Sequence, residues 1–184
     1  MIPVILNFVF FQLVWGISLA GVVYGYAWWG PAALCGFMVW HGATAPTARA
    51  DFVLAGTAVV IGLVLDSVYA RADLISYGGS MFWSGVAPLW ILGLWANFAL
   101  TMNGCMRWLQ SRKALAAVLA FVFGPLSYYA GIALGAATVI GEQWLLFTAI
   151  GVAWAVVLPL LLGLAERFAE RFATADGVAI TYSS

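Results

Sequence analysis

One carboxylate, Asp66, falls inside an apolar stretch of the sequence, in the context LVLDSVY, and lies in the last third of the helix predicted over residues 52–69. An acidic side chain costs roughly 2.5–3.5 kcal/mol near the middle of a membrane helix, so an acid retained there is a candidate functional group. It could serve as a general acid/base in a catalytic step. Alternatively, it could be an interfacial partner for Arg71 or for a tyrosine hydroxyl or tryptophan indole. The sequence leaves both interpretations open.

Further polar side chains occur in apolar stretches and could orient a substrate by hydrogen bonding. The candidate binding residues are Gln12, Asn97, Thr101, Asn103 and Tyr128. Asn97 and Thr101 are four positions apart and therefore share a helix face, whereas Asn103 points elsewhere. Amide side chains also join helices within membrane bundles, with each bond worth about 0.6–2 kcal/mol. A purely structural role is therefore the alternative for these residues.

Groups that could bind a metal or a cofactor are scarce in this sequence. His41 is the one histidine, and no HxxxH, HExxH or paired Cys/His spacing surrounds it. Cys35 and Cys105 both fall in apolar segments, where packing accounts for a free thiol. No P-loop, dinucleotide-binding fingerprint or nucleophile elbow occurs. We therefore expect no metal site and no cofactor.

The overall composition places these polar groups in a membrane protein. Of the 184 residues, 65% are hydrophobic and 8% are charged, whereas soluble domains carry about 25% charged residues. The mean hydropathy of +1.04 indicates that lipid surrounds most of the protein surface. Membrane lipids are therefore the expected partners of the protein. Seven Lys and Arg residues balance seven Asp and Glu residues, which argues against nucleic-acid binding.

Six apolar stretches are candidates for transmembrane helices, which need about 20 apolar residues each. They cover residues 2–24, 29–44, 52–69, 86–106, 114–138 and 143–165. The sequence thus predicts an all-α fold, a polytopic membrane protein with a six-transmembrane-helix bundle in one domain, residues 1–172. Residues 173–184 are expected to form a disordered cytoplasmic tail.

The distribution of cations predicts the orientation of this bundle. With six spans, both termini share the side that carries Arg49, Arg107, Arg112, Lys113, Arg167 and Arg171. Arg71 lies on the other side, so we expect the N- and C-termini to be cytoplasmic. Four tryptophans would then lie at the outer interface, where indole rings are enriched: Trp28, Trp29, Trp83 and Trp144.

Two GxxxG pairs, Gly21/Gly25 and Gly131/Gly135, predict close helix contacts. They could act as seams through which the chain forms a homo-oligomer or binds a membrane partner. Tyr128 lies close to the second pair on the helix surface.

Several short motifs resemble those of a known family. They are N-x4-Q-x2-W at residues 7–15, LDS at residues 65–67, a PLW…LW…T-x-N run at residues 88–103 and GPLSYYAG at residues 124–131. In this order they are similar to a family of small bacterial inner-membrane proteins, catalogued as domain of unknown function 2878. The resemblance implies a multi-pass protein of the bacterial inner membrane and assigns no catalytic residues. It also implies a lipid-related role, because members occur near genes for modifying unsaturated or cyclopropane fatty acids.

Two main functional hypotheses follow from these residues. In the first, Gln12, Asp66, Asn97 and Tyr128 converge from four helices on one pocket that binds or modifies a lipid or other apolar molecule. In the second, the protein is a non-catalytic scaffold, an assembly partner or a small transporter subunit. An ion or proton pathway through Asp66 is a further alternative. Whether the protein is an enzyme stays open at this point.

Overall fold

The computed structural model describes residues 2–79 and 85–175. Within these ranges the α-helices are α1 (Ile2–Val23), α2 (Trp29–Thr44), α3 (Ala48–Arg71), α4 (Leu89–Ala99), α5 (Lys113–Ala133) and α6 (Gln143–Ala175). A short 3-10 helix, η1 (Arg107–Leu109), precedes α5. Two three-residue strands, β1 (Ile75–Tyr77) and β2 (Ala137–Val139), pair antiparallel. The predicted all-α class is confirmed.

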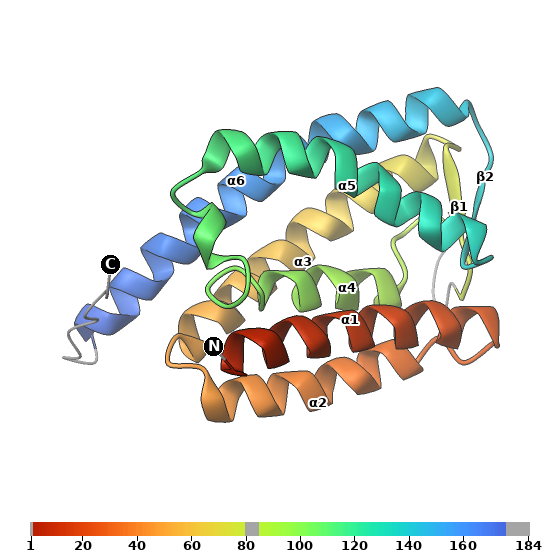
Figure 1. Ribbon diagram of the computed structural model, residues 1–184. Coiled ribbons are helices and arrows are strands. Elements are labelled where there is room, and N and C mark those ends of the chain that lie inside the picture. Colours follow the sequence, from red (N-terminus) through yellow and green to blue (C-terminus); the bar gives the residue numbers. More distant parts are fainter. Residues whose placement is uncertain (1, 80–84, 176–184) are drawn as a thin grey trace.

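Successive helices run in alternating directions along the molecule (Figure 1). α1 begins and α6 ends at the same end of the bundle, which we call the terminal end. The opposite end, called the hairpin end, holds β1 and β2. The element positions put η1, the start of α3 and the start of α5 at the terminal end, together with the cations that they carry.

Four described helices, α1, α3, α5 and α6, are long and apolar enough to cross a membrane. α2 has 16 residues and α4 has 11 residues. At 1.5 Å per residue these two helices extend about 24 Å and about 16 Å, less than the roughly 30 Å hydrocarbon core of a bilayer. The chain is therefore a helical bundle of membrane-protein character, with four helices rather than six that qualify as spans by length and composition.

The predicted span at residues 86–106 is wrong in its length. Regular helix stops at Ala99, and the chain continues in turns as far as η1. The first residues of this stretch are buried, with Leu100 and Met102 each 0% exposed, and residues 103–106 are half-buried. The Asn7 carboxamide donates to the Leu100 carbonyl at 3.1 Å and accepts from the Cys105 N–H at 3.1 Å. Asn7 thus replaces hydrogen bonds that the backbone no longer makes within a helix.

Other predicted boundaries also differ from the structure. α5 ends at Ala133 instead of continuing to residue 138, because residues 137–139 pair with β1. α3 begins at Ala48, which brings Asp51 into its first turn. α6 continues through Ala175, so the first residues of the predicted tail are helical. Residues 176–184 and Trp83 lie outside the described residues.

Neither GxxxG pair lies on one continuous helix face, which corrects the prediction of glycine seams. Gly25, with φ +83, follows the end of α1, and Gly135, with φ +87, follows the end of α5. Glycine adopts this left-handed conformation without steric cost and commonly ends helices. Gly21 packs within the chain, since a Cβ there would lie 2.6 Å from the Tyr26 carbonyl oxygen. A homo-oligomer or membrane partner stays a prediction.

α3 and α4 form the centre of the bundle. α3 packs against α4 and α6, α1 packs against α2, and α5 packs against α6. α1 and α5 are not among the closely packed helix pairs of the described chain. Residues of both helices line the candidate site.

Candidate functional site

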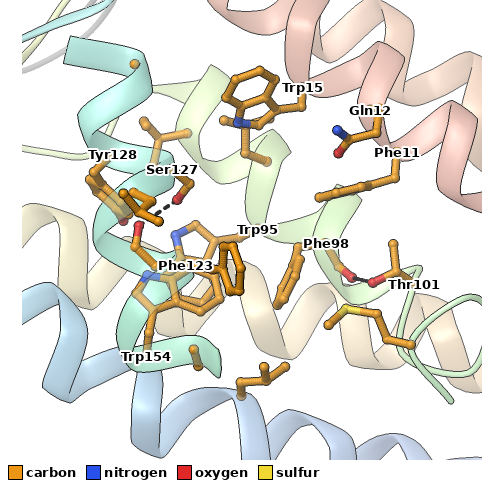
Figure 2. A pocket seen from close by; sticks show the side chains of 18 of the residues that line it. Phe11, Gln12, Trp15, Trp95, Phe98, Thr101, Phe123, Ser127, Tyr128 and Trp154 are labelled. Atoms are coloured by element: carbon orange, nitrogen blue, oxygen red, sulfur yellow. Dashed lines mark hydrogen bonds between the residues drawn. The ribbon is translucent and has the colours of Figure 1, made fainter. Parts of the chain in front are cut away.

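A pocket of about 680 Å³ lies between α1, α4 and α5, with α6 and the strands contributing to its walls (Figure 2). Its lining is strongly aromatic and includes Phe8, Phe11, Trp15, Trp90, Trp95, Phe98, Phe123 and Trp154. Figure 2 shows six of these rings projecting from α1, α4, α5 and α6 toward a common space, namely those of Phe11, Trp15, Trp95, Phe98, Phe123 and Trp154. Such a lining suits an apolar ligand.

Stacked rings form one wall of this pocket. The Trp95 and Trp154 rings are 4.6 Å apart between centroids and 10° from parallel. Phe98 meets Trp154 edge to face, at 5.1 Å and 82°. Two glycines make room for this stack. A Cβ at Gly62 would overlap the Trp95 indole, and a Cβ at Gly124 would lie 2.8 Å from Cγ of Trp154.

The Asp66 carboxylate lies directly behind this wall and accepts three hydrogen bonds. Oδ1 accepts from the Tyr77 hydroxyl at 2.6 Å and from the Tyr128 hydroxyl at 2.7 Å. Oδ2 accepts from Nε1 of Trp95 at 2.7 Å. The three donors line the pocket, whereas Asp66 is 0% exposed and does not line it. One carboxylate on α3 thus holds side chains from β1, α4 and α5 in place.

The partners of Asp66 are phenols and an indole rather than Arg71. Nε of Arg71 donates to the Gly85 carbonyl at 3.1 Å. The oxygens of a carboxyl group accept hydrogen bonds, so three donors can satisfy Asp66 without a cation. Burial, and after it the neighbouring Asp66, raises the pKa of the Tyr77 phenol. Tyr77 therefore keeps its proton and its role as a donor at physiological pH.

A model of the family described as Protein of unknown function (DUF2878) matches residues 4–160. The matched range runs from α1 into α6 and includes Asp66 and its three donors. The chain belongs to this family. The resemblance inferred from the short motifs is confirmed, while a bacterial origin stays a prediction. Neither the curated proteins nor the solved structures contain a match to the chain.

Three predicted binding residues of this DUF2878 chain, Gln12, Thr101 and Tyr128, line the pocket. The Thr101 hydroxyl donates to the Phe98 carbonyl at 2.6 Å and so serves the end of α4. Asn97 does not line the pocket, because its Nδ2 donates to the Phe11 carbonyl at 3.0 Å and joins α4 to α1. Whether the lining residues bind a ligand stays a prediction.

Asn103, the fifth predicted binding residue, belongs to a separate buried cluster at the terminal end. Its Nδ2 donates to Oδ1 of Asp51 at 2.7 Å, and its Oδ1 accepts from Nε2 of Gln110 at 2.7 Å. Oδ2 of Asp51 accepts from the Thr47 hydroxyl at 2.8 Å and lies 2.8 Å from Nε2 of His41. This cluster connects α2 and α3 to the turns that follow α4.

Sequence reasoning did not single out Asp51, Tyr77 or Trp95. Asp51 lies just before the predicted third span, residues 52–69, although an acid in a first turn close to a preceding histidine is a signal for such a pair. Tyr77 and Trp95 carry no local signal, because their shared partner is distant in the sequence. Within residues 2–79 and 85–175, no three His, Cys, Asp or Glu side chains gather closely enough to hold a metal ion.

Proposed function

We propose that this chain is a multi-pass membrane protein that holds one lipid or other apolar molecule in the pocket between α1, α4 and α5. The observation that carries the proposal is the pocket itself. Its volume of about 680 Å³ falls within the roughly 300–1,000 Å³ typical of ligand sites. Aromatic and aliphatic side chains supply most of its lining, and a few polar groups could fix the orientation of a ligand.

The topology that we propose has six passes, with both termini in the cytoplasm. α2 and α4 are short, but the buried turns after α4 extend the fourth pass, and Asn7 satisfies part of their backbone. Non-helical backbone is tolerated at membrane depth where protein buries it. The gathering of cations at the terminal end, with Arg71 at the hairpin end, supports a cytoplasmic terminal end. A helical bundle suits the bacterial inner membrane, since outer-membrane proteins are β-barrels.

Asp66 is a positioning residue in this proposal. It orients the Tyr77, Trp95 and Tyr128 side chains and does not itself line the pocket. A catalytic role would have to pass through a phenol, with Tyr128 or Tyr77 moving a proton between the carboxylate and a bound molecule. The binding function needs no such step.

Native mass spectrometry with lipid extraction, on protein purified in mild detergent, tests the proposal. We expect one apolar molecule per chain in the wild type. Ser127→Trp places a bulky ring in the pocket lining on α5 and should expel this molecule. Val122→Trp is the matched control on the same helix, because Val122 is exposed and does not line the pocket. An empty wild-type protein would overturn the proposal and favour a scaffold, assembly partner or small transporter subunit.

A further inference from the structure

We infer that the pocket accepts a long-chain molecule whose polar group is uncharged, such as a hydroxyl or a carbonyl, in preference to an anionic lipid. This inference rests on the proposed function and specifies the chemical class of the ligand. Three features of the described residues support it: the charge of the lining, the unused polar groups on α1, and the composition of the rim.

The lining of the pocket provides no partner for a charge. No Lys, Arg, His, Asp or Glu of the described chain is among its lining residues. The Asp66 oxygens just behind the wall already accept hydrogen bonds from Tyr77, Trp95 and Tyr128, and they are acceptors that offer an anion no donor. Bringing an unpaired anion into such a site costs far more than bringing in a hydroxyl or an ester. The guanidinium of Arg112 lies 5.9 Å from the centroid of the Trp108 ring, and Trp108 rather than Arg112 lines the pocket.

Most polar side chains of the lining already have partners within the chain. The Ser127 hydroxyl donates to the Gly124 carbonyl at 2.7 Å, and Nε1 of Trp90 donates to the Gly78 carbonyl at 2.8 Å. Thr101 and the donors to Asp66 are occupied in the same way. These groups shape the pocket but have little left to offer a ligand.

Gln12 and Trp15 are the exceptions on α1. Both line the pocket, and neither side chain makes a hydrogen bond to another described residue. They are three positions apart, so they project from one side of the helix into the same space (Figure 2). The indole N–H is a donor, and the carboxamide is both donor and acceptor. Together they match a carbonyl, which accepts, or a hydroxyl, which does both.

The rim of the pocket is apolar and lies between two helices that do not pack closely together. Phe8 on α1 is 51% exposed, and Phe123 on α5 is 60% exposed. In the proposed topology this rim faces hydrocarbon rather than water. A neutral lipid dissolved among the acyl chains can therefore reach Gln12 and Trp15 without passing charged side chains.

Two matched pairs of probes test the inference on the full-length protein in detergent. Native mass spectrometry or competition binding compares oleyl alcohol with oleate, and dioleoylglycerol with dioleoyl phosphatidylglycerol. We expect the neutral member of each pair to bind about tenfold more tightly or better, which corresponds to about 1.4 kcal/mol. Gln12→Leu and Trp15→Phe keep the apolar shape of the lining and should each weaken oleyl alcohol binding about tenfold. Trp28→Phe, at an exposed tryptophan outside the pocket, should leave binding unchanged.

Failure of the inference differs from failure of the proposed function. Equal or tighter binding of oleate or phosphatidylglycerol would overturn the inference while leaving a lipid-binding pocket. So would wild-type affinity for oleyl alcohol in both Gln12→Leu and Trp15→Phe. Loss of phosphatidylglycerol binding in Arg112→Gln would place an anionic headgroup at the Trp108 rim and would also overturn the inference. A wild-type protein that binds none of the probes and releases no lipid on extraction would overturn both.

Discussion

The Tyr128 hydroxyl on α5 donates a 2.7 Å hydrogen bond to the Asp66 carboxylate on α3, across 62 positions of the sequence. Tyr77 and Trp95 reach the same carboxylate from β1 and α4. A single buried acid therefore fixes three side chains that line the pocket. Both the stability of the bundle and the retention of a ligand should therefore depend on Asp66.

Asp66→Asn should destabilise the bundle. The amide replaces one acceptor oxygen with a donor, so at least one of the three donors, Tyr77, Trp95 or Tyr128, loses its acceptor. We expect a decrease of about 2–4 kcal/mol in the free energy of unfolding, measured by denaturant titration in detergent. Asp73→Asn makes the same chemical change at an exposed site and should stay within about 0.5 kcal/mol of wild type. Equal effects at the two positions would contradict the role assigned to Asp66.

Tyr128→Phe should have a smaller effect on stability and a clear effect on the ligand. Asp66 keeps two donors, so we expect a loss of about 1 kcal/mol. The pocket wall loses its fixed orientation, so the extracted lipid should fall below one molecule per chain in native mass spectrometry. Tyr129→Phe changes the neighbouring, exposed tyrosine and provides the control. Full lipid occupancy in Tyr128→Phe would show that the Tyr128–Asp66 bond does not shape the site.

Gly62→Ala should be strongly destabilising because the new methyl group would overlap the Trp95 indole. Relief requires Trp95 to leave both its stack with Trp154 and its bond to Asp66. We expect a loss of about 3 kcal/mol or more, measured by thermal unfolding. Gly56→Ala is the matched control in the same helix. A Cβ there meets nothing within 4 Å, so alanine should be neutral or slightly stabilising.

Asn7→Ala should loosen the turns that follow α4. The substitution removes an acceptor for the Cys105 N–H and a donor to the Leu100 carbonyl. We expect a loss of about 2–3 kcal/mol and faster hydrogen exchange confined to residues 100–106. Gln12→Ala removes an amide from the same helix that makes no bond within the described chain, and exchange in these turns should not change. Unchanged exchange in Asn7→Ala would mean that the buried turns hold themselves in place.

The proposed orientation can be tested by cysteine labelling in cells. In a background with Cys35→Ser and Cys105→Ser, Ser111→Cys places an exposed thiol at the terminal end and Thr138→Cys places one at the hairpin end. A membrane-impermeant maleimide should label the second variant in intact cells and the first only after permeabilisation. The reverse pattern would invert the topology, and labelling of both in intact cells would contradict a six-pass arrangement.

Three features of the chain differ from what their sequence patterns predicted. Residues 86–106 are apolar enough to resemble one transmembrane helix. Hydropathy adds up the transfer free energies of the side chains and carries no information about the conformation of the backbone. The structure replaces the second half of this helix with turns that a side chain from α1 satisfies. Gly25 and Gly135 matched a helix-packing pattern, but their positive φ angles make them turn residues. Three amide side chains in apolar stretches of the sequence have different surroundings in the fold: Asn97 bonds to α1, Asn103 bonds to Asp51, and Gln12 lines the pocket.

The sequence alone determined the all-helical class, the membrane character, the alternation of apolar stretches and the identity of Asp66 as an unusual buried acid. These properties follow from the amino-acid composition and from the free-energy cost of placing a charge in an apolar medium. Both can be read from neighbouring residues in the sequence. Only the tertiary structure decided which side chains meet. The rotation and offset of each helix are set by packing, as at Gly62 against Trp95 and Gly124 against Trp154. Packing placed Tyr77, Trp95 and Tyr128 around Asp66, sent Asn103 to Asp51, and left Gln12 and Trp15 facing an open pocket.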